Sequence, residues 1–252
     1  MQEQHDNVSR MQAVTVSREY GSGGGEIARR LASHLGWQLI DHEIVVRVAR
    51  SLEISEEEAQ ARDEHGESVV SRILTSMQGV DPGFLVAAPM PPPISTETYN
   101  EALRDVVMGA IATGHVVIVG RGSQTLLANR RDVLHVRIIA PLDQRVSYVM
   151  QREGLDADAA RERIQLKDRD RERYLQNEYH LRSDDPHLYD LVLNMSVLDL
   201  NGGVDLIAVA LAHKAARLSI PTGQLGPVTG LSRYPGQPGD FRPPTTPKPA
   251  AG

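Results

Sequence analysis

The sequence predicts an α/β fold in which a parallel β-sheet is covered by helices on both faces. Three observations predict it. Short apolar runs alternate with amphipathic helical stretches along the chain, a glycine cluster joins the first strand to the first helix, and a glycine turn ends a later buried strand. Crossover helices between successive strands make those strands parallel. The 252 residues, 40% of them hydrophobic, are enough for one substantial core.

The first element pair is the most informative part of the chain. Residues 12–36, "QAVTVSREYGSGGGEIARRLASHLG", read as a strand, a glycine loop and a helix that ends at Gly36. Backbone N–H groups of such a loop can converge on an anion at the positive end of the helix, and a nucleotide is the anion we expect. The residues predicted to bind it are Gly21, Ser22, Gly23, Gly24 and Gly25.

The elements that follow keep the alternation. "WQLID" predicts a second strand over 37–41, and helical patterns follow it. The prolines of residues 79–94 exclude regular structure, and we interpret this stretch as a surface insertion rather than a flap over a site. A helix then opens at Ser95 or Thr96 and ends at Gly114.

The second half of the chain predicts three more strands. "HVVIVGRG" is a buried strand that ends in a glycine turn, and residues 133–140 and 188–195 are two further strands. Three helices are predicted between and after these strands. The first covers residues 142–152, the second begins at Asp156 or Asp158 and continues through a long charge-dense stretch, and the third covers residues 204–216.

Composition predicts one domain with polar ends. Residues 1–10 read as a disordered arm, residues 11–219 as the domain, and residues 220–252 as a disordered tail rich in Pro and Gly. The absence of cysteine excludes disulfides, thiolate catalysis and Cys-ligated metal centres. The net charge of −6 argues against a general nucleic-acid binder.

The sequence also predicts where in the cell the protein is found. There is no secretory leader and no apolar run long enough to cross a bilayer, so we expect a cytoplasmic protein without membrane partners. The oligomeric state stays open, and a homodimer is one option.

Four motifs occur in an order that resembles the cytidylate kinase-like family. They are "SREYGSGG", "LIDHEIVVR" after the second strand, "VGRG" after the third, and "DRDRER" before the final "YDLVLN" strand. The resemblance covers residues 12–216. It implies a three-layer P-loop nucleotide kinase fold with a helical lid over residues 156–183. It also implies transfer of the ATP γ-phosphate, with Mg²⁺, to CMP, dCMP or a related small acceptor.

The resemblance also implies roles for individual residues. Arg47 and Arg121 would hold the acceptor phosphate, Asp41 and His42 would lie at the acceptor pocket, and Asp170 would lie near the acceptor sugar. Arginines suit this work because their planar forks grip phosphate in a bidentate way. Gly122 stands where orthodox cytidylate kinases have the aspartate of "GRDxGT". In the lid, Arg169 and Arg173 would reach the phosphates as the lid closes.

The loop departs from a standard P-loop. The motif G-x-x-x-x-G-K-[ST] needs a lysine for the outer phosphates and a hydroxyl for magnesium, and Gly25-Glu26 stands in that neighbourhood instead. Arg18, just before the loop, is our candidate for the missing cation, ahead of Arg29 and Arg30. Ser17 or Ser22 is the candidate hydroxyl for Mg²⁺.

Other interpretations fit parts of the sequence. The same fold could be a catalytically weak or inactive nucleotide-binding regulatory module, since the lysine is missing. Gly21-x-Gly23 followed by Asp41 also imitates a dinucleotide-binding fingerprint, although Glu26 at its third glycine position counts against that. Taken alone, "KDRDRER" would be a solvated helix face, and Asp41 a helix cap.

Overall fold

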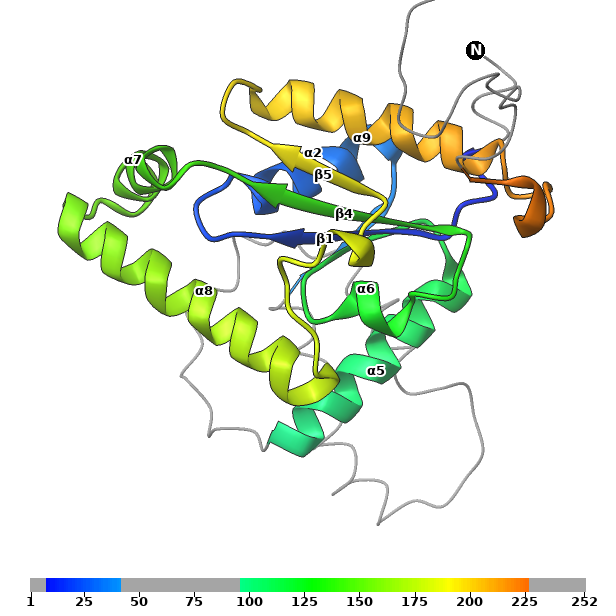
Figure 1. Cartoon of the computed structure of the whole chain (residues 1–252), viewed down its shortest axis with the longest axis horizontal. Helices are drawn as coiled ribbons and strands as arrows, with labels where there is room; N and C mark the ends of the chain where they lie inside the picture. The colour runs from blue at the N-terminus through cyan, green and yellow to red at the C-terminus, as the bar shows by residue number, and fades with distance from the viewer. Residues whose placement is uncertain (1–7, 42–95, 227–252) are drawn as a thin grey trace, which may run out of the picture. The chain divides into compact units, whose positions relative to one another are not determined.

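A computed structural model of the chain describes residues 8–41 and 96–226 (Figure 1). In these ranges five strands form one sheet in the order β2-β3-β1-β4-β5, and every neighbouring pair is parallel. The predicted α/β class is therefore confirmed. The strands are β1 (Ala13–Arg18), β2 (Gln38–Ile40), β3 (Val116–Val119), β4 (Val133–Ile139) and β5 (Leu191–Asn194).

Helices cover both faces of this sheet. The longer ones are α2 (Gly24–Leu35), α5 (Thr96–Thr113), α7 (Leu142–Glu153), α8 (Ala157–Tyr179) and α9 (Leu200–Ala215), and α6 (Ser123–Leu126) is a single turn. In Figure 1, α2 and α9 lie on one side of the sheet and α5, α6 and α8 on the other. The three predicted layers are present.

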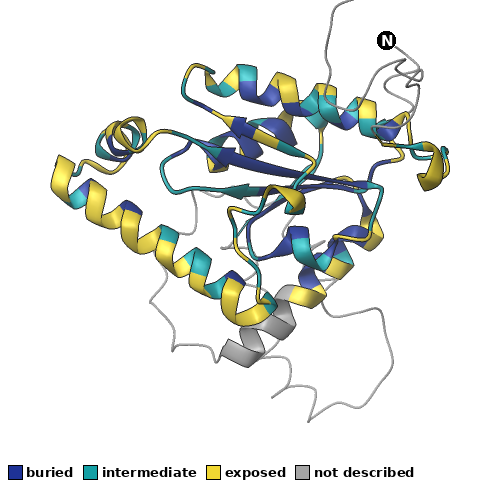
Figure 2. Ribbon diagram, in the orientation of Figure 1, coloured by how far each residue is buried: buried dark blue, intermediate teal, exposed yellow. Residues whose placement is uncertain are grey.

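The alternation of side chains along the strands explains the two cores. Val14 and Val16 of β1 pack with Ile27 of α2 and Leu211 of α9. Ala13, on the opposite face of β1, packs with the α5 side chains around Val107. Because side chains of a strand alternate between faces, one apolar strand supplies both layers. Figure 2 shows β4 mostly buried and the outer surface of α8 exposed, while β5 at the edge of the sheet is partly exposed.

Caps set several helix boundaries that periodicity left open. Asp156 rather than Asp158 caps α8, because its carboxylate accepts the N–H of Ala159 at 2.8 Å. Asp199 caps α9 in the same way, so this helix begins at Leu200, before the predicted residue 204. The last strand is shorter than predicted because Pro186–Leu188 forms a 3₁₀ turn before it.

The chain divides into two compact units, Met1–Leu218 and Ser219–Gly252. In the described part of the second unit, Thr222–Gln224 forms one 3₁₀ turn. The Pro-rich loop 79–94 lies outside the described residues, as do most of the predicted arm and tail, so these stay predictions. None of the helices in the described ranges is long and apolar enough to cross a bilayer.

The start of α2 allows a test of backbone crowding. A Cβ built on Gly24 would lie 2.6 Å from Cβ of Arg18 and 3.2 Å from Cβ of Ile138, whereas one on Gly25 meets nothing within 4 Å. We predict that Gly24→Ala lowers the free energy of unfolding by about 1–3 kcal/mol through overpacking. Denaturant unfolding followed by circular dichroism measures this change.

Gly25→Ala is the matched control. At this open helical position alanine should leave the free energy of unfolding unchanged or raise it by up to about 1 kcal/mol. Equal destabilisation by both substitutions would contradict the packing argument.

Candidate functional site

The glycine loop between β1 and α2 is held by its own serine. Gly21 and Gly23 both have φ of +81°, a left-handed backbone that glycine adopts without strain. The Ser22 hydroxyl lies 2.9 Å from the Glu19 carbonyl oxygen and 3.3 Å from that of Ile138. Ser22 is thus buried against the sheet, and its hydroxyl stabilises the loop rather than facing the site.

The Glu26 carboxylate is neutralised on α2. One oxygen, Oε1, lies 2.6 Å from Nη2 of Arg29 and 2.9 Å from Nε of Arg30. The hydrogen bond from Arg29 lowers the pKa of Glu26 below its ordinary value. Glu26 therefore binds these two arginines and is not available to plug the glycine loop.

Arg18 crosses from the glycine loop to the turn after β3. Its Cβ lies against the backbone of Gly24, as the 2.6 Å approach described above requires, and a side chain at Gly120 would collide with its guanidinium. Both glycines thus leave room for one arginine, which joins the end of β1 to the Gly120–Gly122 turn.

Arg18 lies among other guanidinium groups. Burial, followed by repulsion from Arg171 and Arg121, lowers its pKa to about 9, while Asp41 and Asp168 partly oppose the shift. Burial also lowers the pKa of Arg171. A pKa near 9 leaves Arg18 cationic at neutral pH, so cations of three different segments meet here: β1, the turn after β3 and α8.

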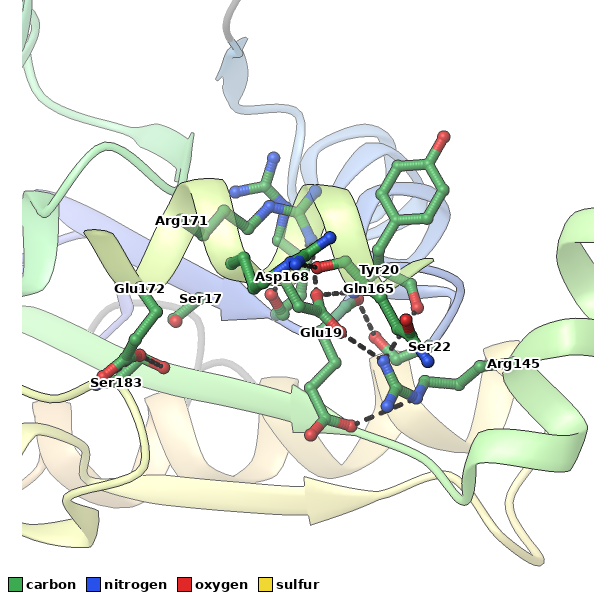
Figure 3. A network of polar contacts seen from close by, with 12 residues as sticks. Ser17, Glu19, Tyr20, Ser22, Arg145, Gln165, Asp168, Arg171, Glu172 and Ser183 are labelled. Atoms are coloured by element: carbon green, nitrogen blue, oxygen red, sulfur yellow. Dashed lines mark hydrogen bonds and ion pairs between the residues drawn. The ribbon is translucent and has the colours of Figure 1, made fainter. Parts of the chain in front are cut away.

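The Asp168 carboxylate of α8 binds the backbone just before the glycine loop (Figure 3). Asp168 accepts the backbone N–H of Tyr20 at 2.7 Å and pairs with Nη1 of Arg145 at 2.5 Å. Its other close cation is Arg171, with Nη1 at 3.4 Å. An amide and two guanidinium groups therefore surround one anionic group, which is the kind of donor set that also binds phosphate.

A second carboxylate anchors the same corner. Glu19 accepts the backbone N–H of Ala140 at 3.1 Å and lies 3.6 Å from Nε of Arg145. Arg145 also donates to the Tyr20 carbonyl oxygen at 3.2 Å. This arginine of α7 thus ties the loop, the end of β4 and α8 together.

A cavity of about 880 Å³ opens at residues 17–20, which lead into the glycine loop, and it is rich in positive charge. The predicted ATP-binding residues 21–25 are not among the residues that line it. Cationic side chains outnumber carboxylates along its wall, although the whole chain carries a net charge of −6. An excess of cations in one hollow favours an anionic ligand. The cations are Arg18, Arg121, Arg137, Arg163, Lys167, Arg169 and Arg171, and the carboxylates are Glu19, Asp168, Asp170 and Glu172.

The predicted lid residues fall into two groups. Arg169 and Asp170 line the cavity from α8, and Nε of Arg169 donates to the Gln165 carbonyl oxygen of its own helix at 3.2 Å. Arg173 is exposed and is not among the residues that line the cavity. The structure thus brings two of these three predicted residues to the wall.

Three further predicted residues, Ser17, Asp41 and Arg121, lie at or near the sheet edge. Ser17 and Arg121 line the cavity, and Asp41, at the end of β2, is close enough to raise the pKa of Arg18. His42 and Arg47 lie outside the described residues. The loop, the end of β2 and the turn after β3 thus meet at the carboxyl edge of the sheet.

Sequence reasoning missed Asp168 and Arg171, although a signal was present. Ile164 and Leu175 of α8 are buried, and residues 164, 168, 171 and 175 share one helix face at spacings of three and four. The apolar pair therefore marks which charges of "KDRDRER" face inward. Arg137 and Arg145 were missed as well, because strand burial and contacts distant in sequence place them at the site.

Three comparisons relate the chain to known proteins. The model of the cytidylate kinase-like family matches residues 13–197. Cytidylate kinase from Methanopyrus kandleri is 28% identical over 191 residues, which are 73% of this chain and 84% of that protein. The solved structure of an uncharacterized protein from Eubacterium ventriosum has a TM-score of 0.57 at 20% identity, covers 79% of this chain and 98% of its own, and shows likeness of fold alone.

A further match covers only part of a longer protein. Uronate isomerase from Corynebacterium glutamicum is 34% identical over 120 residues, which are 48% of this chain. The chain spans 23% of the length of that relative. This match therefore relates a segment, not a whole protein.

Removal of the Asp168 charge tests the attachment of α8 to the loop. We predict that Asp168→Asn lowers the free energy of unfolding by about 1–2 kcal/mol, because a half-buried carboxylate that serves three donors is lost. The amide of Tyr20 should also exchange its hydrogen faster. Denaturant unfolding and hydrogen exchange measure the two effects.

Asp184→Asn is the control for that substitution. Asp184 pairs with Arg182 at 2.7 Å, but both side chains are well exposed, so stability should change little. An unchanged Tyr20 exchange rate in Asp168→Asn would contradict the proposed attachment.

Proposed function

The chain belongs to the cytidylate kinase-like family, and from this premise we propose that it transfers the γ-phosphoryl group of ATP to a nucleoside monophosphate. Family and fold together support a kinase-type phosphotransferase. CMP and dCMP are the acceptors that we propose, and the cytidylate kinases among its relatives support that choice. The observation that carries the proposal is the group of guanidiniums of Arg18, Arg121 and Arg171 in one cavity at the end of β1, where the glycine loop begins.

We propose that the loop binds the donor phosphates. The first N–H groups of α2 have no partner within the helix, and Gly23, Gly24 and Gly25 supply them without side chains that would block an anion. Arg18 stands in for the missing lysine in this proposal, since its stem packs on Gly24 at the loop and its guanidinium reaches across to Gly120. Its fork can bind phosphate oxygens in pairs.

Arginines of the turn after β3 and of α8 hold the acceptor in this proposal. Arg121 follows a buried strand at the carboxyl edge of the sheet, where ligands of parallel α/β folds bind. Arg47, outside the described residues, assists it. Arg169 and Arg171 of α8, with Arg173 after a movement of that helix, surround the transferred group, and Asp170 contacts the acceptor sugar.

The described residues fit poorly as a dedicated magnesium site. The Ser22 hydroxyl faces backbone carbonyl oxygens, and the Ser17 hydroxyl lies 3.3 Å from Nη1 of the cationic Arg137. No group of three or more potential metal ligands occurs among the His, Asp and Glu residues of the described ranges. We therefore propose that Mg²⁺ enters with the nucleotide and is held chiefly by its phosphates and water.

The chemistry asked of the protein is modest. Phosphoryl transfer depends on holding two substrates in line and on positive charge near the moving group. Guanidiniums on both walls of one cavity supply such charge without a proton-transfer step, because arginine stays protonated. Closure of α8 over bound phosphates would exclude water, which could otherwise accept the phosphoryl group.

Arg18 carries the donor half of the proposal. We predict that Arg18→Met weakens MgATP binding about 10- to 100-fold, since charge-assisted hydrogen bonds contribute about 1.5–3 kcal/mol. Without ligand, the variant should be no less stable than the parent, because repulsion from Arg121 and Arg171 is relieved. Calorimetric titration with MgATP measures the affinity.

Arg29→Met is the matched control, because Arg29 already pairs with Glu26 outside the loop. It should bind MgATP like the parent protein. Unchanged MgATP affinity in Arg18→Met would refute the role of Arg18 as lysine substitute.

Arg121 carries the acceptor half. A coupled assay with MgATP and a panel of nucleoside monophosphates should give acceptor-dependent ADP release, highest with CMP or dCMP. We predict that Arg121→Ala loses about 99% or more of kcat/KM while the fold is retained, which corresponds to about 3 kcal/mol of transition-state stabilisation. Circular dichroism checks the fold.

The assay also separates the proposed enzyme from a binding module on the same fold. MgATP binding without ADP release for any monophosphate would contradict phosphotransfer and favour the regulatory module. Full activity in Arg121→Ala would refute its acceptor role.

A further inference from the structure

Arg137 is a buried cation that the proposed function has not used. It lies on β4, its residue is only 9% exposed, and it lines the cavity. Strand register pairs it with Ser17 of β1. A charge in such a place is rare unless a counter-charge or a ligand compensates it.

The partners of Arg137 in the described part of the chain are neutral. Its Nη1 lies 3.3 Å from the Ser17 hydroxyl and 3.4 Å from the Tyr189 hydroxyl, and its guanidinium carbon lies 5.6 Å from the centroid of the Tyr189 ring. Tyr189 is itself fixed, because it donates to the Ser183 carbonyl oxygen at 2.9 Å. The guanidinium is thus oriented but not neutralised by these contacts.

Arg145, another arginine with little exposure, has a different environment. Arg145, with a side chain 12% exposed, has carboxylates of Asp168 and Glu19 beside it. Asp184 is near enough for Arg137 to contribute to its lowered pKa, but the larger cause is Arg182, with which Asp184 pairs at 2.7 Å. Arg137 therefore has no carboxylate of its own within ion-pair distance among the described residues.

The strand geometry decides which half of the site Arg137 serves. Thr15 and His135 share a hydrogen bond of 2.8 Å across β1 and β4, and Ser17 and Arg137 are the next pair on the same face. This is the face of Ala13 and Val133, which pack with α5, whereas α2 packs on the other face. Arg137 therefore lies on the sheet face opposite to α2, the helix that follows the donor loop, and it lines one cavity with the Gly120–Gly122 turn.

We propose that Arg137 is an additional anion-binding residue of the acceptor half and that it holds the phosphate group of the acceptor. This inference rests on the proposed function for the identity of the acceptor. A phosphate supplies the negative charge that hydroxyls lack, and a fork oriented by Ser17 and Tyr189 can bind two of its oxygens. A neutral carbonyl oxygen would leave the buried charge uncompensated.

The test measures phosphate binding rather than turnover. Isothermal titration with inorganic phosphate, in the presence of Mg²⁺ and a non-hydrolysable ATP analogue that occupies the donor loop, gives the dissociation constant. We predict that Arg137→Met weakens phosphate binding about 10- to 100-fold. The phosphate affinity of Arg137→Lys should lie between those of the parent and of Arg137→Met, because lysine keeps the charge but lacks the planar fork. This variant also serves as the second test if Arg137→Met folds poorly.

Arg152→Met is the matched control. Arg152 also lies over a tyrosine ring, Tyr148, with its guanidinium carbon 6.0 Å from the ring centroid, but it is exposed on α7 and does not line the cavity. Phosphate affinity should be unchanged in this variant. Loss of affinity in Arg152→Met equal to that in Arg137→Met would overturn the assignment.

Ligand-free stability separates binding from a structural role. If Arg137 serves a ligand, Arg137→Met should unfold at the same or a higher denaturant concentration, because a buried charge is removed. Lower stability together with phosphate affinity within twofold of the parent would overturn the proposal. Absence of phosphotransfer in the parent protein would instead refute the proposed function, while a phosphate affinity that depends on Arg137 would still support this site.

Discussion

Repulsion between guanidinium groups is the constraint on which the site depends. Arg18, Arg121 and Arg171 come from three segments, and the pKa of Arg18 is lowered first by burial and then by repulsion from the other two. Such a cluster is unfavourable in a ligand-free protein unless anions lie among it. Asp168 provides one, since it binds the Tyr20 amide, Arg145 and Arg171 together. The same donors would suit a phosphate. Asp168, which stabilises the ligand-free protein, and a bound phosphate would therefore compete for the same groups.

The fold tolerates this concentration of charge because the two faces of the sheet differ. One face forms the larger hydrophobic core, and the other carries the polar residues of the cavity. The apolar face of β1 and β4 that packs with α2 and α9 forms the larger core. On the other face, apolar packing near Ala13 gives way to the polar pairs Thr15–His135 and Ser17–Arg137 toward the carboxyl edge. One pair of neighbouring strands thus supplies both the hydrophobic support and the cavity floor.

Much of the fold followed from local signals, and much of the site did not. Strand and helix periodicity, the glycines at 36 and 114 and the Asp156 cap are short-range features, so they predicted element order well. The inward face of α8 is different, because Arg169 and Arg171 are both plausible phosphate ligands in sequence. Both line the cavity, but packing of Ile164 and Leu175 places Arg171 on the half-buried face of α8 while Arg169 is exposed, and that packing depends on neighbours far along the chain.

The sequence by itself determined that strands alternate with helices and that a glycine loop follows the first strand, because glycine freedom and apolar periodicity act within a few residues. Only the tertiary structure decided which charges meet. Asp168 lies 148 residues from the Tyr20 amide that it binds, and Arg137 lies 120 residues from Ser17. Such pairs arise from sheet register and helix packing, which depend on the whole core rather than on any local pattern.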